Sequence, residues 1–162
     1  MLFGFVSEVM TLKMPLLAKI LVVYTLVWYP LLKFAGYSQQ VVSHFSGGIS
    51  DESFEYLSYL PKFFGLFAIV ASLAFILSGS GRIRIFIMSA FLIFSPLYNL
   101  LEPLFLFQLE PTIAQNAEIV RRSWNAQAFW FVASFGWSVA WLIYLLRSKG
   151  IAAWLAAESK AQ

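Results

Sequence analysis

The fold is decided by residues 61–107, PKFFGLFAIVASLAFILSGSGRIRIFIMSAFLIFSPLYNLLEPLFLF, where only the turn GSGRIR separates two long apolar runs. The hydrocarbon core of a bilayer is about 30 Å thick, and an α-helix needs about 20 apolar residues to cross it. Each run meets or nearly meets that length. A link this short returns the chain beside itself. Residues 61–79 and 85–107 are therefore predicted to form an antiparallel pair of membrane helices.

Two further apolar runs flank this pair, over about 14–36 and 126–147. Only helices and closed barrels satisfy their backbone polar groups inside a bilayer, and runs of this length are helical. The sequence thus predicts an all-α integral membrane protein, a four-helix antiparallel transmembrane bundle forming one membrane domain over residues 1–162. The connecting segments are two outer loops, about 37–60 and 108–125, and a cytoplasmic tail, 148–162.

Short interfacial helices are expected beside the spans. Ser50 is a typical N-cap, and the acidic residues that follow it suit a first helical turn. A short amphipathic helix ending before Pro61 would then rest on the headgroups. A helical turn is expected over 114–125, and the tail forms a second interfacial helix anchored by Trp154 and Leu155.

Composition excludes several classes of function. Hydrophobic residues make up 60% of the chain and charged residues 12%, whereas soluble domains have about 25% charged residues. The absence of cysteine excludes disulfides, thiolate metal sites and a cysteine nucleophile, and His44 alone cannot build a histidine metal site. No cluster of basic residues resembles a nucleic-acid footprint. No cofactor, metal or nucleic-acid partner is expected.

The distribution of lysine and arginine predicts the orientation. Cytoplasmic loops carry an excess of these residues. Seven would lie on the side of the termini: Lys13, Lys19, Arg82, Arg84, Arg147, Lys149 and Lys160. Four would lie on the other side: Lys33, Lys62, Arg121 and Arg122. Both termini are therefore expected in the cytoplasm, and the N-terminus lacks the basic region of a cleavable signal peptide.

Small residues form a face on each of two spans. One face lies on the second span and the other on the fourth, at spacings of three and four residues. Their members are Gly65, Ala68 and Ser72, and Ala133, Gly136 and Ala140. Membrane helices associate through close backbone packing on such faces. Packing within the bundle is the simpler interpretation, and a partner or oligomer contact is the alternative.

Aromatic residues form a different face of the fourth span. Trp130, Trp137, Trp141 and Tyr144 recur at intervals of seven, four and three, so they stack along one side of a helix. Packing and interface anchoring explain them most simply. The alternative is a face that grips lipid chains, a pigment or another subunit.

Glu102 is the one acidic residue inside a predicted span, and such residues are functional suspects. It lies near Asn99 and about 25 Å from the start of its span, close to the outer interface. We expect a structural ion pair between Glu102 and one of three basic residues, with an ion or proton role as the alternative. The three are Lys33, Arg121 and Arg122.

The fourth span ends in WLIYLLRSKG, which supplies Trp141, Tyr144, Ser148 and Lys149. This ending resembles a family of small bacterial four-span membrane proteins of unknown function, whose last helix has a Trp-x-x-Tyr pair followed by Ser-Lys-Arg-Val. Gly150 and Ile151 stand here in place of Arg-Val, and the family's Gly-Gly-Trp-Leu opening is absent. The resemblance implies a bacterial cytoplasmic membrane and no assigned activity.

No catalytic constellation or nucleotide fingerprint is present, so we expect no enzyme. The leading hypothesis is a non-catalytic accessory or scaffolding subunit of a larger membrane assembly, with other membrane subunits or further copies of itself as partners. A second is a small homo-oligomeric channel or transporter whose path includes Glu102, Asn99 and Lys19. A third is a lipid- or pigment-binding protein that uses the aromatic face. A membrane enzyme built on outer-loop polar residues comes last.

Overall fold

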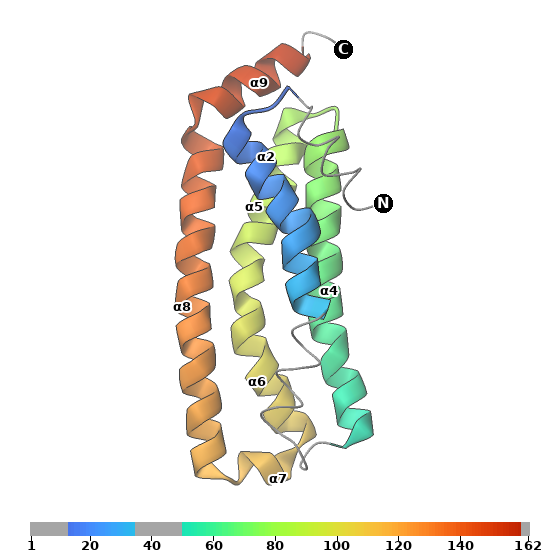
Figure 1. Cartoon of the computed structure of the whole chain (residues 1–162), viewed down its shortest axis with the longest axis vertical. Coiled ribbons are helices and arrows are strands. Elements are labelled where there is room, and N and C mark those ends of the chain that lie inside the picture. Colours follow the sequence, from blue (N-terminus) through green and yellow to red (C-terminus); the bar gives the residue numbers. More distant parts are fainter. Residues whose placement is uncertain (1–12, 35–49, 160–162) are drawn as a thin grey trace.

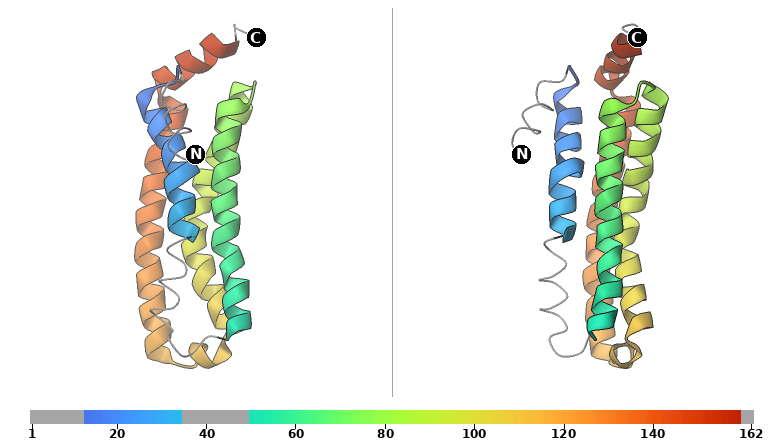
Figure 2. Two further views of the ribbon diagram at one scale, coloured as in Figure 1. Left: turned by 45° about the vertical axis from the view of Figure 1, so that its right-hand side comes forward. Right: turned by 90° about the vertical axis from the view of Figure 1, so that its right-hand side faces the viewer.

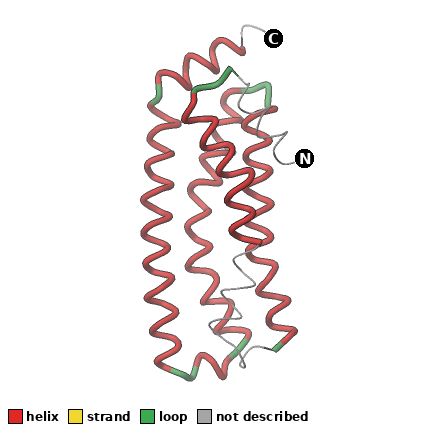
Figure 3. Tube along the Cα trace, viewed as in Figure 1, coloured by secondary structure: helices red, strands yellow, loops and turns green. Residues whose placement is uncertain are grey.

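The computed structural model describes residues 13–34 and 50–159. Four of the described helical segments are long and apolar enough to cross a membrane: Leu16–Phe34, Glu52–Leu77, Gly81–Leu109 and Ala117–Arg147. Successive spans run in opposite directions (Figures 1 and 2). No strand occurs in the described part of the chain, as the tube trace of Figure 3 makes plain. The predicted all-α membrane bundle is confirmed.

The first span contains a π-helical turn. It begins as α2 (Leu16–Val23), continues as η1 (Tyr24–Trp28) and returns to helix over 29–34. Thr25 lies in the π turn, where its hydroxyl is within hydrogen-bond distance of the carbonyls of Leu21 and Val22 and of the Ser72 hydroxyl on the second span. Such turns widen a helix locally and are frequent at functional sites.

The second span is longer than predicted. Ser50 does cap a helix, because its hydroxyl accepts the backbone N–H of Ser53 at 3.2 Å. That helix does not end before Pro61 as expected, however, but runs on as α4 (Asp51–Leu77). Membrane helices tolerate an internal proline. The first turns are held by Leu57, which packs with Leu106 and Ile113 of the neighbouring elements.

The third span is broken near its middle. α5 (Gly81–Phe94) leads into the short 3₁₀ turn η2 (Ser95–Leu97) and then into α6 (Tyr98–Leu109). Pro96 has no N–H, so it cannot bond the Leu92 carbonyl in the α-helical pattern, and Pro103 does the same to the carbonyl of Asn99. The break therefore follows from the prolines.

The second connection, 108–125, is mostly helical, and the helical turn expected over 114–125 is part of longer helices. α7 (Pro111–Ala114) is a single turn, and α8 (Ala117–Arg147) begins nine residues before the predicted start of the fourth span. The Asn116 side chain caps α8 by accepting the backbone N–H groups of Glu118 and Ile119. Glu118 also pairs with Arg121 and Arg122 one turn later, which favours the helix here.

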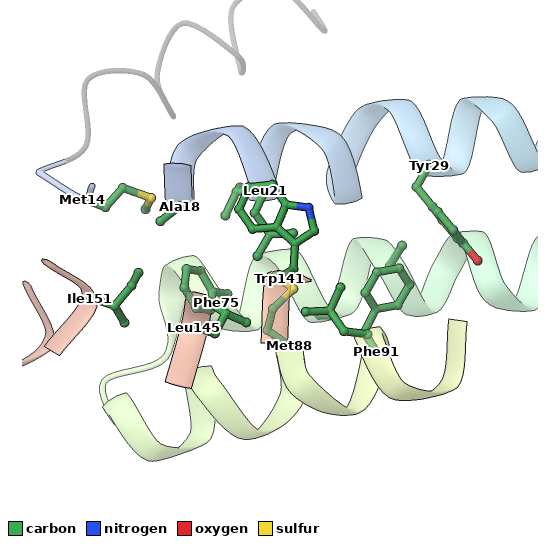
Figure 4. Packing of buried hydrophobic residues seen from close by; sticks show 14 of the residues in the cluster. Met14, Ala18, Leu21, Tyr29, Phe75, Met88, Phe91, Trp141, Leu145 and Ile151 are labelled. Atoms are coloured by element: carbon green, nitrogen blue, oxygen red, sulfur yellow. The ribbon is translucent and has the colours of Figure 1, made fainter. Parts of the chain in front are cut away.

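The core fills the end of the bundle at which α9 (Lys149–Ser159) lies, here called the α9 end. Leu21, Phe75, Met88 and Leu145 come from four different spans and are fully or nearly fully buried (Figure 4). Ile151 of α9 closes this layer from outside. A packed apolar layer therefore closes the α9 end, and the same buried cluster continues along the bundle to Phe64 and Tyr98.

α9 is docked on the bundle and does not merely lie beside it. Its Trp154 is buried, and its ring centroid lies 5.7 Å from that of Phe75. The guanidinium of Arg84 lies over the Trp154 ring at 4.9 Å, while its Nε donates to the carbonyl of Ser78 at the end of α4. A cation at a helix C-terminus complements the helix dipole. Arg84 thus ties the α4–α5 turn to α9.

Candidate functional site

A cavity of about 410 Å³ occupies the other half of the bundle, toward α7 (the α7 end). It lies between the first span, the broken third span and α8. Its polar lining residues are Tyr24, Tyr29, Lys33, Ser95, Tyr98, Asn99, Glu102, Ser123, Gln127, Ser134 and Ser138. Polar and charged side chains inside a span mark functional sites by default. This cavity is the candidate site.

The cavity reaches the protein surface between the first span and α8. Leu32, Trp130 and Trp137 line it and are themselves 59%, 55% and 47% exposed. All three belong to segments that are apolar enough to lie in the bilayer. The opening is therefore lateral and apolar, toward lipid. The two charged residues of the cavity lie on the first span, Lys33, and on the third span, Glu102.

Lys33 is held by aromatic rings. Its ammonium lies over the ring of Tyr98, 3.2 Å from the centroid, and 5.5 Å from that of Tyr29. Cation–π contacts are worth about 0.5–2 kcal/mol, with the larger values where water is excluded. Tyr98 is buried by Phe64, whose ring centroid is 5.6 Å away. The rings therefore fix the position of the ammonium at the cavity wall.

Glu102 supplies the opposite charge. Its carboxylate accepts a hydrogen bond from Gln127 Nε2 of α8 at 3.0 Å, and its charge attracts that of Lys33. Of the three basic residues considered from sequence, Lys33 shares the cavity with Glu102. Arg121 and Arg122 pair with Glu118 on the exposed start of α8. The site thus contains one positive and one negative side chain.

Hydrogen-bonding groups continue the polar wall. Asn99 Nδ2 donates to Ser134 Oγ at 2.9 Å, and Ser134 in turn donates to the carbonyl of Phe131 at 3.1 Å. Tyr29 is 9% exposed, and its hydroxyl has no hydrogen-bond partner among the described residues. The oxygen is itself covered by protein, so the hydroxyl is an unsatisfied donor inside the wall of the cavity, which is costly.

The two small-residue faces have different environments. Gly65, Ala68 and Ser72 are buried on α4 against the first span. Ala133, Gly136 and Ala140 are exposed on α8, and a methyl group added at Gly136 would meet no atom within 4 Å. The bundle therefore uses the face of α4 and leaves the face of α8 open.

The aromatic face of α8 divides along its length. Trp141 is buried, and its ring centroid lies 5.6 Å from that of Trp137 and 5.7 Å from that of Tyr144. Trp130 and Trp137 lie at the cavity opening. Trp137, Trp141 and Tyr144 thus form one run of ring contacts, and Trp130 lines the cavity opening together with Trp137.

Other residues considered from sequence lie away from the cavity. Lys19 is a half-buried residue of α2 and does not line it. His44 lies outside the described residues, and no metal-binding group of histidine and acidic residues occurs among those described. Sequence reasoning missed the other polar lining residues, among them Tyr29, Tyr98 and Gln127. Their signal was weak, because each is a neutral polar group in or beside a mostly apolar run.

Comparisons with known proteins add nothing to this geometry: no family model, curated protein or solved structure matches the chain. The function must therefore be argued from the cavity.

Proposed function

We propose that this protein is a non-catalytic membrane protein that binds an amphiphilic molecule in the cavity at the α7 end. One observation carries the proposal: a cavity with a charged and hydrogen-bonding wall opens between two membrane spans past exposed apolar side chains. A ligand with a polar head and an apolar tail matches both parts at once. Sites for small molecules are typically cavities of 300–1,000 Å³ with a few polar groups, roughly the size found here.

The packing supports binding over conduction. A pore would need polar positions along the whole bundle, and the α9 end is instead filled by Leu21, Phe75, Met88 and Leu145. The second span contributes the buried hydroxyl of Ser72, which is close to that of Thr25. The described residues therefore support a site that ends inside the protein.

Two alanines of α8 provide a matched test. Ala126 and Ala128 are both exposed, but only Ala126 lines the cavity. An indole at Ala126→Trp would occupy the opening, while Ala128→Trp adds the same side chain outside it. The purified proteins are extracted with organic solvent, and the amphiphiles retained per chain are quantified by mass spectrometry. We expect a species present in the wild type and in Ala128→Trp and depleted in Ala126→Trp. Equal content in all three proteins would refute the proposal.

A second candidate function is that of an accessory or scaffolding subunit. The exposed face of Ala133, Gly136 and Ala140 favours it, because small residues allow close approach of another membrane helix. The mass and composition of the particle in mild detergent test this idea. Stoichiometric co-elution with other membrane subunits supports it, whereas a particle with several copies of this chain alone favours a homo-oligomer.

We further propose a bacterial cytoplasmic membrane with both termini in the cytoplasm. The family resemblance of the last helix supports the membrane, and the seven basic residues on the side of the termini support the orientation. The cavity would then open into the outer leaflet. Gln115 and Gly150 are both exposed and lie on opposite sides in this orientation. A membrane-impermeant thiol reagent should label a cysteine at Gln115 in intact cells. It should label a cysteine at Gly150 only after the cells are permeabilised.

A further inference from the structure

The two charges of the cavity specify the head group of the ligand. Lys33 and Glu102 line the same space, so their charges sum to zero there. An anionic ligand would be repelled by the Glu102 carboxylate, and a cationic ligand would be repelled by the Lys33 ammonium. A molecule that carries both charges can face each with its opposite, which is the cheapest way to place a charged head group at membrane depth.

The hydrogen-bonding groups define the two ends of such a molecule. The Lys33 ammonium, which lies over the ring of Tyr98, is the donor on the cavity wall. A phosphate diester supplies acceptors for it. The Glu102 carboxylate, which also accepts from Gln127, offers acceptors on the same wall. A primary ammonium, with three N–H donors, fits that side.

The aromatic rings distinguish between kinds of ammonium. A quaternary ammonium has no N–H and is recognised by aromatic faces. In this cavity Lys33 already lies over the face of Tyr98 and near that of Tyr29. The Glu102 carboxylate accepts from Gln127 and, with two oxygens, can also accept hydrogen bonds from a primary ammonium. The wall therefore favours ethanolamine over choline.

From this juxtaposition we propose that the ligand is a phosphatidylethanolamine-type lipid, with its phosphate at Lys33, its ammonium at Glu102 and its acyl chains leaving past Leu32, Trp130 and Trp137. This inference rests on the proposed function and adds the chemical class of the ligand. The apolar, lipid-facing opening points to an intact lipid as the source of the head group.

The test is competition among three synthetic lipids with identical acyl chains. The purified, delipidated protein is mixed with equimolar phosphatidylethanolamine, phosphatidylcholine and phosphatidylglycerol, and the bound species are counted by native mass spectrometry. We expect preferential retention of phosphatidylethanolamine. Loss of one charged hydrogen bond in Lys33→Met or Glu102→Gln should weaken that retention about tenfold.

Two exposed residues of α4 provide controls of the same chemistry. Lys62→Met and Glu55→Gln remove the same charges outside the cavity, so they should retain the preference of the wild type. The wild-type competition decides the question even where a cavity variant fails to fold. Equal retention of the three lipids, or a preference for another, overturns the inference. If a bound amphiphile of another class is lost in Ala126→Trp, the proposed function stands and only the lipid class is wrong. If Ala126→Trp changes the retention of no amphiphile, the proposed function and the lipid class are both wrong.

Discussion

The small-residue faces of α4 and α8 have the same kind of sequence and opposite environments. Ala68 and Ser72 on α4 are fully buried, and the hydroxyl of Ser72 is close to that of Thr25 on the first span. Ala140 at the corresponding position of the α8 face is exposed. A small-residue face therefore permits close packing but does not produce it. What matters is which side of the helix the rest of the bundle covers.

The largest change in stability should come from placing a leucine on the small-residue face of α4, compared with a leucine on that of α8. Ser72→Leu introduces a bulky side chain where no space exists, so it should lower the free energy of unfolding by about 2 kcal/mol, a typical cost of overpacking. Ala140→Leu should change it by less than about 0.5 kcal/mol, because surface substitutions rarely do more. Unfolding by titration with denaturing detergent, followed by circular dichroism, measures both. Similar losses in the two variants would contradict the comparison.

Glycine-to-alanine changes should reveal the same difference between the α4 and α8 faces, with smaller changes in stability. Alanine is up to about 1 kcal/mol more favourable than glycine inside a helix. Gly136→Ala should realise that gain, because its new methyl group would meet no atom within 4 Å. At Gly65 the methyl would lie 2.9 Å from Phe34 Cζ, so the half-exposed Phe34 ring would have to move, which reduces the gain. The same unfolding assay should rank Gly136→Ala above Gly65→Ala, and the reverse order would count against the packing.

Loss of a buried hydroxyl should have a smaller effect still. Hydrogen bonds between membrane helices average about 0.6 kcal/mol, so Ser72→Ala should cost about that much. Ser89→Ala is the control, because the Ser89 hydroxyl is buried with no partner among the described residues. Removing it should be neutral or stabilising. A Ser72→Ala variant as stable as Ser89→Ala would show that the Thr25 contact contributes nothing.

The smallest effect concerns the acid dependence of the anchor that holds α4 at its N-terminus. The Ser50 backbone N–H and hydroxyl both lie 2.9 Å from Glu110 Oε1. Hydrogen bonds from the Ser50 N–H and from the Ser53 and Ser50 hydroxyls hold the pKa of Glu110 below its usual value of 4.5. The stabilisation is therefore present above that value and is lost as the pH falls through the lower folded-state pKa.

Glu110→Gln tests this anchor. The variant should show a weaker fall in stability below pH 4.5 than the wild type, measured by thermal unfolding across that range. Glu118→Gln is the control for a carboxylate that pairs only along its own helix. An unchanged pH profile in Glu110→Gln would exclude the anchor.

Much of the fold could be predicted from the sequence, because the length of an apolar run reports directly on the thickness of a bilayer. The N-cap of α4 at Ser50 was predicted, but the continuity of this helix through Pro61 was not, because a proline normally suggests a helix boundary. Packing of Leu57 on Leu106 and Ile113 accompanies the continuous helix. The sequence also could not predict which side of α8 packs against the bundle. Sequence spacing places Trp141 and Gly136 on different faces but does not say which faces inward.

The candidate site was predicted only in fragments. Glu102 and Asn99 were suspected because polar residues are expensive in a span, and Lys33 was one of three possible partners of Glu102. Tyr29 was not suspected. A tyrosine near the end of a span normally anchors the interface, and its buried hydroxyl is evident only from the surrounding contacts.

The π-helical turn at Tyr24–Trp28 makes the site depend on the number of residues in the first span as well as on their identity. Each residue of an α-helix advances the chain by about 100° around its axis. If this turn became a regular α-helix with all its residues retained, everything after it would rotate by about 100°. Lys33 would then face away from Tyr98 and Glu102, although no residue of the cavity had been changed. The wide turn therefore sets the direction in which the Lys33 side chain leaves the first span.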